Sequence, residues 1–252
     1  MIKLCRDTML LFTRNIKKTF RSPWWLIGLS QPILYLLLYM PLLKNLGGSS
    51  TLSLGEIAKV FVPGMLVIMG VASLFAGFSL IPEIREGLIS RWLVSPVSRV
   101  AILLSLLLNQ MVLLGLQSIV LFTIAILLGL RISIPGGILT FLLVLLIGST
   151  MTCFSYVISI ATKSEDGLAS MVNTLYLPIM LLSGVMLPIS LAPDWLKTAA
   201  LFNPFYYAVE AGRALFAGNF SDSIIIKGFV VMIIFVIIAI WCAVKSLNKM
   251  AA

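Results

Sequence analysis

The sequence has 252 residues, of which 60% are hydrophobic and 11% are charged, and its mean hydropathy is +1.12. This composition excludes a soluble globular domain and is typical of a polytopic membrane protein. The formal net charge is +9, there is no His, and three Cys at positions 5, 153 and 242 offer neither a metal-ligand cluster nor a disulfide pair.

Residues 1–22 are predicted to form an amphipathic helix that lies at the membrane surface and keeps its basic face in water. A cleaved signal peptide is the alternative, but Arg14, Lys17 and Lys18 interrupt its apolar core, so we expect the segment to be retained. The apolar stripe is Ile2, Cys5, Met9, Phe12, Ile16 and Phe20, and the basic face is Lys3, Arg6, Arg14, Lys17, Lys18 and Arg21.

Six apolar segments follow that are long enough to cross a bilayer as helices. The first contains Gln31 and Pro32, which place an amide and a missing backbone donor inside the bilayer, where a neighbouring helix must satisfy them. With Asn109 and Asn173 of later spans, these two residues are the candidates for a translocation path. The predicted spans are 24–43, 57–81, 100–130, 137–161, 168–188 and 224–244.

Two of these spans carry small or weakly polar residues along one face. Such faces are typical of close helix packing rather than ligand binding. They consist of Gly70, Ser73 and Gly77 in the second span and of Gly148, Thr152, Ser155 and Ser159 in the fourth.

Residues 83–99, between the second and third spans, are too polar for the bilayer, where a central charged residue costs about 2.5 to 3.5 kcal/mol. Ile84, Leu88 and Trp92 recur at every fourth position, which predicts a helix against an apolar surface that Pro96 ends. A cytoplasmic loop anchored by arginines and a docking helix for a soluble partner both fit this pattern. The candidate docking residues are Glu83, Arg85, Glu86, Gly87, Arg91, Trp92, Pro96 and Arg99.

Residues 189–223 form a longer segment before the last span. Asn203 and Pro204 predict the start of a helix and Gly218 its end. Such a helix is about 20 Å long, short of the roughly 30 Å hydrocarbon core, so we expect it to be re-entrant or to lie at the outer surface. Both an aromatic anchor and a gate fit the pattern. The candidate gate residues are Trp195, Asn203, Pro204, Tyr206, Tyr207, Glu210 and Arg213, the last two being close enough to pair.

The distribution of basic residues decides the predicted orientation. Six spans put both termini on the same side, and assigning that side to the cytoplasm leaves twelve Lys and Arg inside against four in the outer loops. The positive charge therefore reflects membrane topology and indicates no nucleic-acid partner.

No motif for nucleotide binding or nucleophilic catalysis occurs in the chain. The phosphate-binding loop Gly-x-x-x-x-Gly-Lys-Ser/Thr and the Gly-x-Ser-x-Gly elbow are both absent. A membrane-embedded hydrolase needs paired carboxylates, His or an activated Ser, and an ion-coupled transporter normally shows intramembrane charges and inverted repeats. Neither pattern is visible, so any ATP that drives this protein is hydrolysed by another polypeptide.

Several short motifs occur in an order and spacing that resemble a known family. The chain resembles the permease subunits of type-2 ABC exporters of drugs, polysaccharides and lipids, nearest to the daunorubicin-resistance-like branch. The departure is Leu88, Ile89 and Ser90, where the family is often richer in acidic residues. The motifs are Gln31-Pro32, Pro63-Gly64, Arg85-Glu86-Gly87, the stretch 93–99, Leu182-Ser183-Gly184 with Pro188, and Asn203-Pro204 ahead of Arg213.

This resemblance implies an all-α membrane domain with six spans, an amphipathic N-terminal helix, a cytoplasmic coupling helix over residues 83–99 and short re-entrant helices within 189–223. It also implies a separate ATPase that binds Mg-ATP, so that this chain itself needs no cofactor. Two identical permeases, or this chain and a homologous one, would pair in a bacterial or archaeal plasma membrane.

The expected substrate is a hydrophobic or amphipathic drug-like or natural-product compound, because Met, Leu and aromatic walls suit a bulky amphiphile. Export of a lipid-linked polysaccharide or a lipid is the alternative. Ion-coupled secondary transport is a further alternative, which the lack of buried ionisable residues in the spans disfavours.

Overall fold

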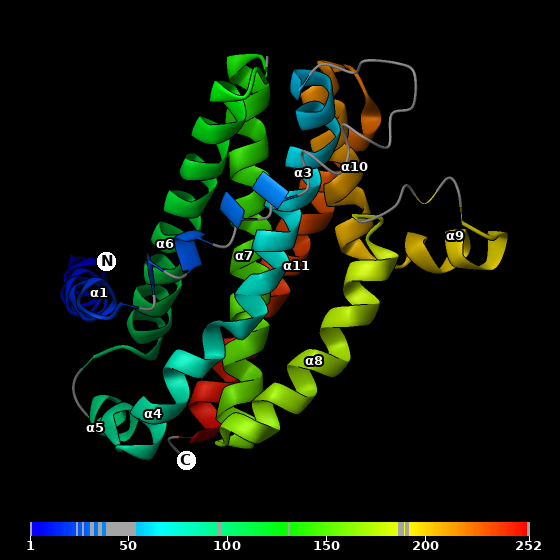
Figure 1. Cartoon of the computed structure of the whole chain (residues 1–252). Helices are drawn as coiled ribbons and strands as arrows, with labels where there is room; N and C mark the ends of the chain where they lie inside the picture. The colour runs from blue at the N-terminus through cyan, green and yellow to red at the C-terminus, as the bar shows by residue number, and fades with distance from the viewer. Residues whose placement is uncertain are drawn as a thin grey trace.

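The computed structural model describes residues 2–23, 25–26, 28–30, 33–34, 37–38, 54–94, 97–130, 132–185, 189 and 192–250, with the backbone alone at residues 2, 54–61, 90, 93–94 and 250. The regular structure in these ranges is entirely helical, which confirms the all-α part of the predicted fold class (Figure 1). The helices are α1 (Ile2–Arg21), α3 (Leu54–Ala72), the 3-10 helix η1 (Ser73–Ser79), α4 (Leu80–Arg85), α5 (Leu88–Val94), α6 (Arg99–Leu127), α7 (Ile134–Thr162), α8 (Glu165–Leu182), α9 (Asp194–Leu201), α10 (Pro204–Ala217) and α11 (Ser223–Met250).

Four helical stretches in the described residues are long and apolar enough to cross a membrane. They correspond to the predicted second, third, fourth and sixth spans. Figure 1 shows α6, α7 and α11 running along one another, with the consecutive helices α3, η1 and α4 in front of them. The stretches are Val62–Arg85, Arg99–Leu127, Ile134–Thr162 and Ser223–Lys249.

The first and fifth predicted spans are not among these four stretches. Most of the first, 24–43, lies outside the described residues, and so do Gln31 and Pro32. The fifth, 168–188, corresponds to α8, which begins with two acidic residues and ends at Leu182. At about 1.5 Å per residue α8 is roughly 27 Å long, slightly shorter than the hydrocarbon core. The count of six spans therefore stays a prediction.

Serine residues start three of the long helices by the same local mechanism. The side chains of Ser98, Ser133 and Ser164 accept hydrogen bonds from backbone N–H groups three residues further along. Each bond satisfies one of the four donors that a helix N-terminus leaves unpaired. At the opposite end of α7, Lys163 adopts a left-handed conformation with φ of 50°, which lets the chain reverse into α8.

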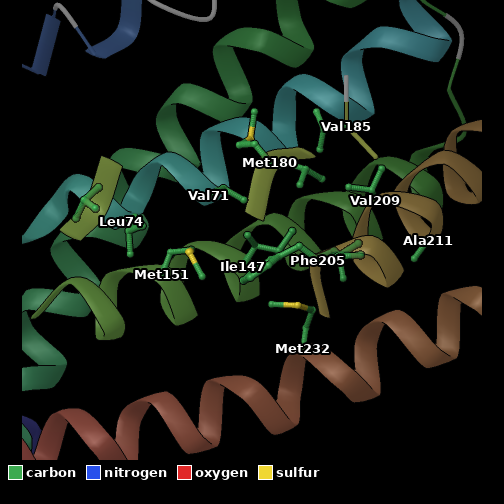
Figure 2. Packing of buried hydrophobic residues seen from close by; sticks show 14 of the residues in the cluster. Val71, Leu74, Ile147, Met151, Met180, Val185, Phe205, Val209, Ala211 and Met232 are labelled. Carbon is green, nitrogen blue, oxygen red and sulfur yellow. The ribbon is translucent and has the colours of Figure 1, made fainter. Parts of the chain in front are cut away.

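Helix α7 lies at the centre of the buried core. Figure 2 shows Ile147 and Met151 of α7 surrounded by side chains from α3, η1, α8, α10 and α11. Because lipid tails are as apolar as these side chains, burial away from water gives little driving force inside a bilayer, and close packing has to hold the helices together. The surrounding residues drawn in that view include Val71, Leu74, Met180, Phe205, Val209 and Met232.

The two predicted small-residue faces pack as expected, because they meet where α7 packs against α3 and η1. A Cβ atom built at Gly70 would lie 2.8 Å from Cγ2 of Ile147, so only glycine lets the helices approach this closely. Gly77 likewise lies against Ser155. The outward sides of α6, α7 and α11 instead expose large aliphatic residues, which suits hydrocarbon.

The bundle has two distinct ends. The end that carries α4, α5, the start of α8 and the last turns of α11 is called the α5 end here, and the opposite end is called the α10 end (Figure 1). Helix α1 is seen along its axis in Figure 1, so it crosses the long helices rather than following them, and it packs against α6.

Candidate functional site

The segment predicted as one helix over 83–99 is in fact two helices and a turn. Helix α4 ends at Arg85, Gly87 has a φ of 69°, and α5 covers Leu88–Val94. The N–H of Glu86 donates to the carbonyl of Pro82, and that of Gly87 donates to Ile84, which closes α4. The prediction of a continuous helix was wrong because a left-handed glycine ends a helix whatever the apolar repeat around it.

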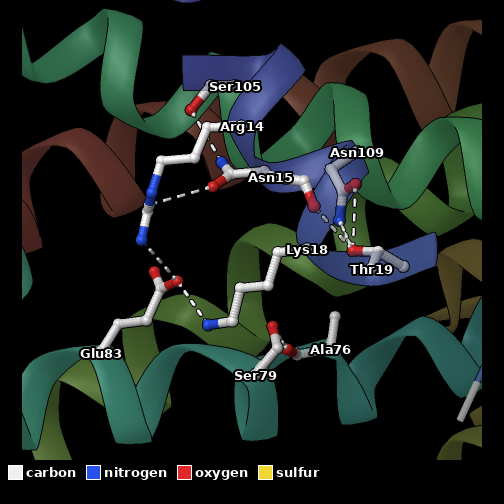
Figure 3. Close-up of polar contacts among 9 residues, drawn as sticks. All are labelled: Arg14, Asn15, Lys18, Thr19, Ala76, Ser79, Glu83, Ser105 and Asn109. Carbon is white, nitrogen blue, oxygen red and sulfur yellow. Dashed lines mark hydrogen bonds and ion pairs between the residues drawn. The ribbon is translucent and has the colours of Figure 1, made fainter. Parts of the chain in front are cut away.

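Glu83 is buried instead of lying on the docking surface. Its side chain is only 5% exposed, and Oε1 accepts a hydrogen bond from Nζ of Lys18 at 2.8 Å (Figure 3). An Nη atom of Arg14 lies 3.9 Å from the same oxygen. Both cations come from α1, and a buried carboxylate requires such partners. Glu83 therefore joins the end of the second span to the N-terminal helix.

Helix α5 is also held by α1 and by the core. The guanidinium of Arg14 lies 4.8 Å from the centre of the Trp92 ring, within the range of a cation–π contact. Ile89 is fully buried in a cluster that includes Ile102 and Leu106 of α6. Helix α5 is thus anchored on one side and cannot move without moving its neighbours.

The candidate docking residues that remain exposed lie at the α5 end. Glu86 and Arg91 are exposed, and Arg85 lies 3.8 Å from Glu165 at the start of α8. Arg99 is the first residue of α6, and its guanidinium donates to Asn248 of α11 at 2.8 Å. Pro96 lies outside the described residues.

Helix α1 carries three different faces. Asp7, Thr8 and Asn15 are buried against the bundle. Met9 and Phe20, on the predicted apolar stripe, are 59% and 41% exposed. The third face consists of the exposed residues Lys3, Arg6, Lys17 and Arg21. A helix with adjacent protein-bound, apolar and basic faces fits the edge of a bilayer.

Asn109 contacts α1, although the sequence placed it among the path residues. Its Nδ2 donates to Oγ1 of Thr19 at 3.2 Å (Figure 3). One turn earlier, Asn15 donates to Oγ of Ser105 at 3.4 Å. Asn173 of α8, by contrast, is exposed on the described surface. Of the described path candidates, only Asn173 lies on a face that the described residues leave exposed.

At the α10 end, the predicted helix over Asn203 to Gly218 is present with both predicted boundaries. The side chain of Asn203 accepts from the N–H of Phe205 at 3.0 Å, Pro204 is the first residue, and Gly218 ends the helix at φ of 81°. Helix α10 rises from the middle of the bundle, where Phe205 packs near Ile147, and follows the first half of α11 (Figure 1).

Polar side chains tie α10 to the end of α8. Arg213 pairs with Glu210 at 2.6 Å and donates to the carbonyl of Gly184 at 2.8 Å. Asn203 also donates to the carbonyl of Ile179 at 3.1 Å. The carbonyl of Ile179 also accepts from the N–H of Ser183, and Gly184 lies just beyond the last helical residue, so these contacts join α10 to the C-terminal end of α8.

The aromatic candidates of this region lie around the start of α10. The Tyr206 and Tyr207 rings are in edge contact, and the Tyr207 hydroxyl donates to the carbonyl of Leu201 at 3.1 Å. Partial burial and the nearby Glu210 raise the pKa of Tyr206, so its hydroxyl remains protonated at neutral pH. Trp195 of α9 is 71% exposed, as expected for an interfacial aromatic residue.

Sequence analysis missed the joint role of Arg14 and Lys18, which it assigned to a water-facing side. Their spacing of four residues places them on one helix face, and this spacing could have indicated a shared acidic partner. The described part of the chain holds no group of three His, Cys, Asp or Glu that could bind a metal ion.

Comparison with known proteins identifies the family of the chain. The model of the ABC-2 type transporter family matches residues 6–217. A protein of Cyanophora paradoxa named "Putative transport permease ycf38" is 28% identical over 228 residues, which cover 87% of this chain and 78% of the relative. The protein of the same name from Pyropia yezoensis is 26% identical over 230 residues, covering 88% and 79%. Because the family match covers most of its length, the chain belongs to the ABC-2 type transporter family.

Proposed function

We propose that this protein is the permease subunit of an ATP-driven exporter and that a separate ABC ATPase docks at the α5 end. The observation that carries this proposal is the arrangement around Gly87. The turn before α5 exposes the charge of Glu86 and α5 exposes that of Arg91, while Ile89 of α5 is fixed in the core. A partner that moves α5 therefore moves the bundle.

The α5 end is proposed to face the cytoplasm. Arg85, Arg99 and Lys245 lie there, and the positive-inside rule assigns the basic end to the cytoplasm. The apolar face of α1 would then enter the inner leaflet, and its basic face would meet anionic lipid headgroups. Both termini would be cytoplasmic, and the membrane would be the plasma membrane of a bacterium or archaeon.

The open face of α8 supports an amphipathic substrate. Asn173 and Thr174 are exposed beside Leu177 and Leu181, so this face offers hydrogen-bonding groups within an apolar surface. We propose that a second permease, either another copy of this chain or a homologue, faces α8 across the path. A drug-like or natural-product compound fits such a surface, and a lipid or lipid-linked polysaccharide is the second candidate.

The described spans provide little for coupling to an ion gradient. Glu83 is the buried carboxylate in the candidate spans, but it lies in the last turn of Val62–Arg85 and is paired with Lys18. A proton or sodium relay would need further groups deeper in the membrane. ATP hydrolysed by the partner is therefore the proposed driving force.

Docking can be tested by co-purifying the permease with its ATPase. Glu86→Lys reverses an exposed charge at the α5 end, and Gly87→Pro removes the left-handed turn. Both variants should reduce ATPase recovery about tenfold, because each alters the docking surface directly. Asp194→Lys makes the same charge change at the fully exposed start of α9 and should leave recovery unchanged. Normal recovery with both α5-end variants would refute docking at this site.

A further inference from the structure

The second span is interrupted by an unusually long 3-10 segment. Helix α3 ends at Ala72, η1 covers Ser73–Ser79, and α4 begins at Leu80. 3-10 runs longer than three or four residues are uncommon, and within a longer helix they often mark a hinge. Pro82 in α4 has no N–H to donate to the carbonyl of Phe78, which accounts for a break at the end of η1, whereas the beginning of η1, around Leu74, lies beyond the reach of this proline.

The side chain of Ser155 on α7 bonds to the backbone in the first part of η1. Its hydroxyl accepts a hydrogen bond from the N–H of Gly77 at 2.8 Å and donates to the carbonyl of Leu74. Those two backbone groups are three residues apart, the spacing that a 3-10 turn joins directly. The hydroxyl has thus entered the hydrogen-bond ladder of the second span, a recognised cause of helix bending.

The contact is dry and allows no larger residue. Ser155 is fully buried, so water cannot replace either bond when it breaks. A Cβ atom built at Gly77 would clash with Oγ of Ser159 and would lie 2.6 Å from Oγ of Ser155 and 2.8 Å from the backbone oxygen of Ser155. Glycine is therefore required for the Ser155 hydroxyl to reach the backbone of η1.

Two neighbouring hydroxyl groups lack partners. Oγ of Ser73 and Oγ1 of Thr152 are buried and make no hydrogen bond within the described structure. Unpaired buried hydroxyls cost free energy. A straightened second span would turn other groups of η1 toward α7, so these two side chains are available to stabilise a second arrangement.

The 3-10 segment η1 lies between the contacts of α3 with α10 and the docking residues around α5. On one side, α3 packs against α10, where Cβ of Pro63 lies 3.8 Å from a Cβ built at Gly212. On the other side, α4 carries Glu83 and leads through Gly87 into α5. A change of conformation in η1 would alter how α5 is placed relative to α10.

We propose that Ser155 is a positioning residue for transport: its hydroxyl holds η1 bent, and its release lets the second span straighten when α5 moves. This inference rests on the proposed function, because the force on α5 is assigned to a partner ATPase. Loss of the hydroxyl should favour the straightened arrangement by about tenfold, since two buried hydrogen bonds disappear.

The test compares Ser155→Ala with Ser159→Ala in the purified permease. Ser159 is the matched control: it lies one turn away, is equally buried and also faces Gly77, but its hydroxyl donates to the carbonyl of Ser155 within α7 and makes no hydrogen bond to η1 in the described structure. One spin label is placed at position 86, directly after α4 at the α5 end, and the other at position 127, the last residue of α6 at the α10 end. The distance between them, measured by pulsed electron resonance, reports the bend of the second span. Ser155→Ala should add a second distance that the wild type and Ser159→Ala lack.

Transport gives the second readout. With the partner ATPase, Ser155→Ala should lower the amount of substrate moved per ATP about tenfold while hydrolysis stays within about twofold, and Ser159→Ala should behave as the wild type. If Ser155→Ala fails to fold, Ser155→Cys replaces it, because a thiol is a similar but weaker partner. Unchanged distances and unchanged coupling in the folded variant would overturn the hinge. A wild-type complex that does not transport would instead refute the proposed function, and the spin-label distances would still test the hinge.

Discussion

Nζ of Lys18 lies 2.8 Å from Oε1 of Glu83, although the two residues are 65 positions apart in the sequence. This contact joins the N-terminal helix to the end of the second span, directly before the Gly87 turn. Any movement of α5 is therefore shared with α1, and α1 is the part of the chain with an open apolar face beside a basic one.

The contact predicts a specific stability difference. Lys18→Met should destabilise the protein by about 1.5 to 3 kcal/mol, because the buried Glu83 loses its charged hydrogen-bond donor. Adding Glu83→Gln should recover part of this loss, since a neutral amide is cheaper to bury without a cation. Thermal unfolding of the purified permease measures both effects. Lys17→Met is the control, because Lys17 is exposed and the described structure gives it no partner. Equal midpoints for the Lys17 and Lys18 variants would contradict the assignment.

Arg213 should stabilise the packing of α10 against the end of α8. Arg213→Met leaves the half-buried Glu210 and the carbonyl of Gly184 without their donor, so we expect a loss of about 1 to 3 kcal/mol and faster proteolysis near residues 189–193. Limited proteolysis followed by mass spectrometry measures the cleavage rate. Lys197→Met removes an exposed ion pair instead and should have little effect. Equal cleavage rates in the two variants would contradict the proposal that Arg213 joins α10 to the end of α8.

Cysteine labelling can test the proposed orientation. In a variant whose three native Cys are replaced by Ser, Asp222→Cys should react with a membrane-impermeant maleimide on intact cells, because it precedes α11 at the α10 end. Glu165→Cys, at the opposite end, should react only after the membrane is opened. The reverse pattern would invert the topology and place α5 outside the cell.

Local signals predicted the bounds of α10, whereas contacts between residues distant in the sequence could not be predicted. The bounds of α10 follow from Asn203, Pro204 and Gly218, which act on their own backbone. The sequence pattern missed the break at Gly87 because the apolar repeat continues on both sides of it. A charged residue at a predicted span end gives no sign that it will be buried, so the environment of Glu83 depended on the tertiary contact with α1.

The 3-10 segment shows the same limit. Gly77 and Pro82 weaken the α-helix locally, but neither indicates a 3-10 segment that begins at Ser73, because the group that enters its hydrogen-bond ladder belongs to Ser155, about 80 positions later. The sequence did identify both small-residue faces and their role in packing. The bond between the Ser155 hydroxyl and the backbone of η1 could not be predicted, because it depends on how α7 is aligned along the second span.

The central claim is that ATP hydrolysed by a partner drives export through this permease. The most direct measurement reconstitutes the permease and its ATPase in proteoliposomes whose ion gradients are collapsed, and follows the movement of an amphipathic fluorescent compound. We predict transport with ATP, none with a non-hydrolysable analogue, and none when a proton or sodium gradient is imposed without ATP. Transport that follows an imposed ion gradient and ignores hydrolysis would contradict the account.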